Sequence, residues 1–178
     1  MLSESDLGKR EIEREHLALF IEAYEEATGE TFDLVDCETP DFIGRDRQGR
    51  AVGIEVTRFQ FDPEDRWMRR TFGGGESFDE DAWWKLLGLL HQKEGKLAKG
   101  RWHLCQRKIL VVMLIDCPLG EIAASFDTDR PNGSGYNEVW LADCTLVEAF
   151  GGVDIFPLSH PTLAGIFPVA SRDQKPYG

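Results

Sequence analysis

Residues 40–57 read PDFIGRDRQGRAVGIEVT, and this stretch decides the fold of the chain. It predicts a strand, a polar turn over Arg45 to Gly49, and a second strand that runs to Phe59. Side chains of a strand alternate between its two faces, so Glu55 and Thr57 point the same way. A glutamate within an apolar strand is costly unless its charge is compensated, and a metal ion is the usual agent. The hairpin is therefore also a candidate site.

The segments around this hairpin predict an α/β protein with a mixed central sheet flanked by helices. Apolar residues at helical spacing predict a first helix over residues 9–28, and a second helix over 79–98 opens with acids that suit its positive end. The apolar run at 108–116 is typical of a strand covered on both faces. We also expect an extended piece at 31–37, loops at 60–78 and 127–135, a short helix at 121–126, and strands at 139–142 and 153–158.

The length and composition are those of a one-domain globular protein. We expect a single domain over residues 1–178, with a core at about 9–117, a C-terminal addition at about 118–170 and a frayed tail at 171–178. The N-terminus is polar and acidic, unlike a signal peptide, and no apolar run is long enough to span a bilayer. Four scattered cysteines without a CxxC pair favour reduced thiols in a cytoplasmic protein.

The charge of the chain is negative overall but unevenly spread. A net charge of −12 argues against a sequence-independent grip on nucleic acid, which depends on lysine and arginine contacts to phosphate. Residues 85–108, in contrast, contain seven basic residues and one acid, a local balance of +6. The sequence thus indicates one basic surface on an acidic body, and a surface of this kind suits nucleic acid locally.

Asp41 opens the first strand of the hairpin, and strand pairing would bring it toward Glu55. Two carboxylates with a nearby backbone carbonyl, such as that of Val56, make a hard-oxygen site suited to magnesium or manganese. The alternative is structural: Asp41 would merely follow a turn proline, and Glu55 would pair with a lysine. The pattern of these residues leaves both interpretations open.

The second predicted helix contains a lysine that bears on this choice. Its apolar stripe runs through Trp83, Leu90 and Leu97, and Lys93 interrupts the stripe between the last two. A lysine on the buried face needs a partner anion, and the carboxylate of Glu55 would serve. Alternatively, Lys93 lies at the edge of the stripe and extends into water.

These residues resemble the core of the PD-(D/E)XK nuclease superfamily, which has a restriction-endonuclease-like fold. Pro40-Asp41 is followed after thirteen residues by Glu55-Val56-Thr57 in a strand-turn-strand. One helix before the motif, and a helix and a strand after it, match that family's α-β-β-β-α-β core, with extra C-terminal strands here. The resemblance covers roughly residues 9–117. Thr57 departs from the pattern, because it stands where the family has its motif lysine.

The resemblance implies a site for magnesium, with manganese as the other metal. Asp41, Glu55 and the Val56 carbonyl would bind the ion, together with an acid from the first helix. Glu13 is phased with the buried face of that helix, and Glu15 less so. The missing lysine would come from the second helix, as in some members of the superfamily. In that helix, Lys93 is the candidate catalytic lysine and Lys96 is the second choice. The predicted contacts to the nucleic-acid backbone are Lys96, Arg69 and Arg70.

The leading hypothesis is therefore a magnesium-dependent phosphodiesterase that cuts or binds DNA or RNA. The first alternative is a catalytically decayed module that keeps the nuclease fold for protein interaction. Thr57 and the acidic composition favour this alternative, and a basic protein would be its partner. The second alternative is a carboxylate-metal hydrolase acting on a small phosphate ester. The sequence does not distinguish among the three.

Overall fold

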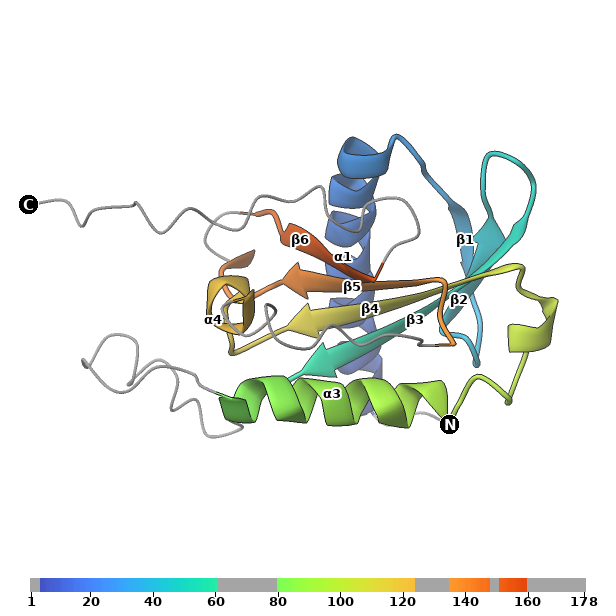
Figure 1. Cartoon of the computed structure of the whole chain (residues 1–178). Coiled ribbons are helices and arrows are strands. Elements are labelled where there is room, and N and C mark those ends of the chain that lie inside the picture. Colours follow the sequence, from blue (N-terminus) through green and yellow to red (C-terminus); the bar gives the residue numbers. More distant parts are fainter. Residues whose placement is uncertain (1–3, 61–79, 124–134, 148–150, 160–178) are drawn as a thin grey trace, which may run out of the picture.

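The computed structural model describes residues 4–60, 80–123, 135–147 and 151–159 (Figure 1). Six strands form one sheet in the order β1-β2-β3-β4-β5-β6. Their bounds are β1 Asp33–Asp36, β2 Phe42–Arg45, β3 Ala51–Phe59, β4 Arg107–Leu114, β5 Glu138–Asp143 and β6 Asp154–Ser159. β1, β2 and β3 are antiparallel neighbours, β3, β4 and β5 run parallel, and β6 is antiparallel to β5. The predicted mixed sheet of an α/β protein is confirmed.

The two long helices pack against opposite faces of this sheet. Helix α1 (Glu4–Thr28) buries Leu17, Phe20 and Tyr24 in one core cluster, which also contains the face of β3 that includes Ile54. Helix α3 (Glu80–Glu94) buries its apolar stripe in a second cluster, which includes Leu110 of β4. Alternate residues of β3 and β4 therefore belong to different cores, as the period of two in a strand requires.

The remaining elements are short. A 3-10 helix, η1 (Trp102–Leu104), precedes β4, and α4 (Leu119–Ala123) follows it. The backbone N–H of Leu119 donates to Oδ2 of Asp143 at 2.7 Å, which ties the start of α4 to the end of β5. Within the described part of the chain, no helix is long and apolar enough to cross a membrane.

Helix boundaries are where the structure differs most from the prediction. Helix α1 begins earlier than residue 9 but ends where expected, because Gly29 adopts a left-handed φ of 71° and donates its N–H to the Glu25 carbonyl. Helix α3 ends at Glu94 and not at residue 98, since Gly95 follows and the chain continues as turns. The short helix begins two residues before the expected 121. Most of the predicted loop over 60–78, most of the predicted loop over 127–135 and the whole predicted tail over 171–178 lie outside the described residues.

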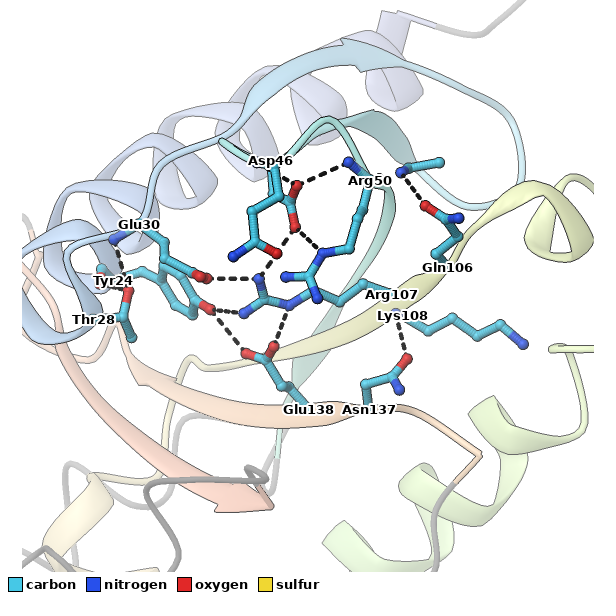
Figure 2. Close-up of polar contacts among 12 residues, drawn as sticks. Tyr24, Thr28, Glu30, Asp46, Arg50, Gln106, Arg107, Lys108, Asn137 and Glu138 are labelled. Carbon is cyan, nitrogen blue, oxygen red and sulfur yellow. Dashed lines mark hydrogen bonds and ion pairs between the residues drawn. The ribbon is translucent and has the colours of Figure 1, made fainter.

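A buried network of charges holds α1 to the amino-terminal ends of β4 and β5 (Figure 2). Arg107, the first residue of β4, donates from Nε to Oε1 of Glu138 at 2.5 Å and from Nη1 to Oε2 of Glu30 at 2.6 Å. Its Nη2 donates to the Tyr24 hydroxyl at 2.6 Å, and that hydroxyl donates to Oε2 of Glu138 at 3.0 Å. Glu138 is only 1% exposed. The negative charge of Glu138 is therefore compensated by groups of the protein and hardly by water.

Candidate functional site

The candidate site lies where β3 continues beyond its pairing with β2. The last pair between these strands is Phe42 with Ile54, but β3 continues to Phe59. Beyond this pair, a side chain takes the place of a strand partner: Oδ2 of Asp41 accepts the backbone N–H of Val56 at 2.8 Å. Asp41 is thereby held against the open edge of β3 at Val56, the residue that follows Glu55 in the sequence.

The local backbone also explains why a proline precedes Asp41. If the register of β2 and β3 continued, Pro40 would lie opposite Val56. Proline has no N–H and cannot donate to the Val56 carbonyl. In an antiparallel ladder the N–H and C=O of one residue face the same neighbour, so this carbonyl is directed toward the side of Asp41. The Val56 carbonyl thus faces the same edge of β3 as the N–H that donates to Asp41.

The turn that presents Asp41 is fixed by close packing at Gly53. A Cβ at this position would come within 2.9 Å of both Pro40 Cγ and Trp102. The absence of a side chain therefore lets the turn and η1 approach β3. The carbonyl of Thr39 in the same turn accepts the N–H of Arg101 at 2.7 Å. This hydrogen bond joins the chain that follows α3 to the turn that precedes β2.

Glu55 and Lys93 form an ion pair between the sheet and α3. Lys93 Nζ donates to Glu55 Oε1 at 2.8 Å, and the two side chains are 11% and 8% exposed. The interpretation of Lys93 as a residue that extends into water is therefore wrong. The predicted partner anion is present, and it is the glutamate within the apolar strand. Thr57 lies two residues further along the same face and is buried as well.

Two carboxylates close together make the site costly when both are ionised. Burial, and then the Glu55 carboxylate, raise the pKa of Asp41 to about 6, against the opposing effects of the Val56 hydrogen bond and the Lys93 ammonium. Glu13 on α1 raises this pKa further, though less than the other groups. A bound cation would relieve this repulsion, since it favours the charged form of each carboxylate.

These side chains line one open cavity of about 470 Å³. Its described walls come from α1, the turn before β2, β3 and the end of α3; the lining residues are Glu13, Glu38, Thr39, Asp41, Glu55, Val56, Thr57, Arg58, Gln60, Lys93 and Lys96. Glu13 is half-buried here, whereas Glu15 is exposed, so the acid from α1 that reaches the cavity is Glu13.

Other predicted site residues are placed less centrally. Lys96 lines the cavity but is exposed, and it lies in the turn after α3, since the helix ends before it. Arg69 and Arg70 lie outside the described residues. Within the described ranges, no group of three or more His, Cys, Asp or Glu side chains is close enough to hold a metal ion.

Tyr136 is a neighbour of the site that the sequence did not reveal. Its hydroxyl donates to the Lys93 carbonyl at 3.2 Å, and its ring meets Trp102 edge-on with centroids 5.6 Å apart. Burial, followed by the charges of Glu55 and Asp41, raises the pKa of its hydroxyl well above the ordinary value. A single tyrosine at the end of a loop carries no pattern that sequence reasoning could have used.

A scan against protein-family models, a search of curated proteins and a search of solved structures each found no match to this chain.

The pKa of Asp41 leads to a pH-dependent prediction for metal binding. A carboxylate must lose its proton before it binds a cation. With a pKa of about 6, roughly nine in ten Asp41 side chains are protonated one pH unit below it. Isothermal titration with magnesium or manganese should therefore give an affinity about 10-fold lower at pH 5 than at pH 7.5. Equal affinity at both values would contradict a metal site that includes Asp41.

Proposed function

We propose that this protein is a magnesium-dependent nuclease of the PD-(D/E)XK type, acting on the phosphodiester bonds of DNA or RNA. The observation that carries this proposal is the meeting of Asp41, Glu55 and Lys93 at one cavity, beside the start of β2, where β3 continues past its pairing with β2. The order of elements through β4 also agrees with the restriction-endonuclease-like type of α/β fold. Residues from three separate segments would supply the acid pair and the lysine.

The donor set of the cavity fits magnesium. This ion is commonly bound by one or two protein carboxylates, with water and substrate phosphate as its other ligands. Asp41, Glu55 and the Val56 carbonyl would hold it, and Glu13 is near enough to affect the charge of Asp41. When bound, a divalent ion of this kind acts as a Lewis acid toward a phosphate oxygen and makes water a better nucleophile.

The protein's own groups prepare the site for phosphate. The bond to Val56 holds Asp41 in one orientation, and the bond to Lys93 does the same for Glu55. Lys93 carries three N–H donors, so the bond to Glu55 leaves donors for a water or a phosphate oxygen. Its charge would stabilise the extra negative charge that develops on phosphate in the transition state. Thr57 does not supply this charge, which is why the lysine of α3 matters.

The lysine assignment can be tested by moving the charge. Replacing Lys93 by methionine should lower the cleavage rate about 10²-fold, which is the cost of losing one group that stabilises transition-state charge. A Thr57→Lys change in the same protein places a lysine on the same face of β3 as Glu55, and it should restore part of the rate. The rates would be measured on labelled DNA and RNA in magnesium. A Lys93→Met protein as active as the wild type would disprove the migrated lysine.

The second candidate function is a decayed nuclease fold that binds a basic protein. Two observations favour it: the Lys93 ammonium already neutralises Glu55, and the described residues contain no three-residue metal cluster. Titration calorimetry separates the two functions. Magnesium or manganese should bind to an enzyme, and a mutant lacking Asp41 should lose that heat. No heat with either metal, at pH values above the pKa of Asp41, would favour the interaction module.

A further inference from the structure

Arg58 is the one arginine among the described residues that line the cavity, and no carboxylate in that part of the chain forms an ion pair with it. It follows Thr57 on β3, is half-buried and lines the same cavity as Asp41 and Glu55. Its Nε is buried yet has no hydrogen-bond partner among the described residues. Arg107, the other partly buried arginine of the central strands, has its guanidinium bonded to three groups.

A buried donor atom without a hydrogen-bond partner is unfavourable, so the environment of Arg58 Nε needs an explanation. The cavity contains carboxylates, but none in the described part of the chain forms an ion pair with Arg58. The Cys144 thiol is also near the guanidinium. Burial raises the pKa of this thiol to about 12, although the positive charge of Arg58 lowers it slightly. Cys144 is therefore neutral at physiological pH and provides no counter-charge. Within the described residues, the Arg58 guanidinium is therefore left without a counter-charge.

The chemistry of the cavity indicates which anion this is. The Lys93 ammonium is neutralised by Glu55, and Lys96 is exposed to water. Among the described lining residues of the cavity, this leaves Arg58 as the partly buried cation without an ion pair. A guanidinium binds phosphate oxygens through two parallel N–H donors, and it is less strongly hydrated than an ammonium.

We propose that Arg58 binds a backbone phosphate of the nucleic acid and positions the substrate over the carboxylates. This inference rests on the proposed nuclease function and assigns it a substrate-positioning residue. Arg58 would act on binding: its loss should weaken the affinity for nucleic acid and leave metal affinity unchanged. Lys93, in contrast, should affect the rate of the chemical step.

The test measures binding separately from cleavage. All proteins carry Asp41→Asn, which keeps an acceptor for the Val56 N–H, removes one negative charge from the cavity and prevents the expected hydrolysis. Binding of fluorescent single- and double-stranded oligonucleotides is followed by anisotropy over a range of salt concentrations. Adding Arg58→Gln should raise Kd about 10-fold and reduce the slope of log Kd against log salt by about 1.

The matched control is Arg45→Gln. Arg45 is an exposed strand arginine that donates to the Gly49 carbonyl at 2.8 Å, and it does not line the cavity. The Arg45→Gln substitution removes the same formal charge as Arg58→Gln, and it should leave Kd and the salt slope nearly unchanged. Equal weakening by both substitutions would overturn the inference, since the effect would then be one of net charge. Unchanged binding by Arg58→Gln, or no binding by the Asp41→Asn protein, would also overturn it.

Arg58→Lys serves if Arg58→Gln fails to fold, as judged by thermal melting. It keeps the charge but loses the paired donors, so Kd should rise several-fold with the salt slope retained. A Kd equal to that of the Asp41→Asn parent would overturn the inference. Cleavage by the otherwise unaltered chain is measured separately. Cleavage without an effect of Arg58 on binding contradicts this inference alone, and Arg58-dependent binding without magnesium-dependent cleavage contradicts the nuclease proposal alone.

Discussion

Replacing Asp41 by asparagine is expected to lower magnesium-dependent cleavage of nucleic acid by about 10³-fold or more, while the fold survives. Asparagine is nearly the same size, and its side-chain oxygen can still accept the Val56 N–H that Asp41 now accepts at 2.8 Å. It cannot supply the negative charge that a magnesium ligand needs. Cleavage rates and thermal melting, measured on the same preparation, would separate loss of function from loss of structure.

The best control for Asp41 is another acid of the same cavity. Glu38 lines the cavity but is not among the proposed ligands, so Glu38→Gln should change the rate by no more than about 3-fold. Glu55→Gln should resemble Asp41→Asn, and glutamine is preferable to alanine because it leaves an acceptor for the Lys93 ammonium. If Asp41→Asn and Glu55→Gln both cleave at the wild-type rate, the nuclease proposal is wrong.

Replacing Arg107 by methionine is expected to lower the free energy of unfolding by about 3–5 kcal/mol, the largest stability effect we anticipate. Methionine keeps the apolar part of the side chain but leaves the carboxylate of Glu138 buried without its cation. Glu30 and the Tyr24 hydroxyl would each lose a hydrogen bond at the same time. Urea unfolding followed by circular dichroism would measure the change.

Two further variants distinguish a buried network from a surface ion pair. Arg47 pairs with Glu25 at 3.2 Å, but these side chains are 59% and 48% exposed. Arg47→Met should therefore cost less than about 1 kcal/mol. The double variant Arg107→Met, Glu138→Gln should recover part of the loss, because the orphaned charge is gone. A loss from Arg107→Met as small as that from Arg47→Met would contradict the structural role of the network.

Much of the architecture was predictable because it depends on local signals. The period of two around Glu55 and the glycine-containing turn predicted β2 and β3, and the continuous apolar run predicted β4. The boundaries of the helices were less predictable. Gly95 ends α3 near Glu94, although the apolar stripe appeared to continue to Leu97. A stripe reports which face is buried, while the last hydrogen-bonded turn depends on the residues that follow.

The hairpin of residues 40–57 already contained Asp41 and Glu55, and the stripe of α3 already marked Lys93 as unusual. Periodicity and charge were enough to single out Glu55 and Lys93, because each is a charged residue within the apolar pattern of its own strand or helix. The tertiary structure decided which interpretation of Lys93 holds, by placing its Nζ on Glu55. It also brought together Arg107, Tyr24, Glu30 and Glu138, and it buried Nε of Arg58 where no other described residue bonds to it. Contacts of this kind join segments far apart in the chain, and their energy depends on burial that no single segment can specify.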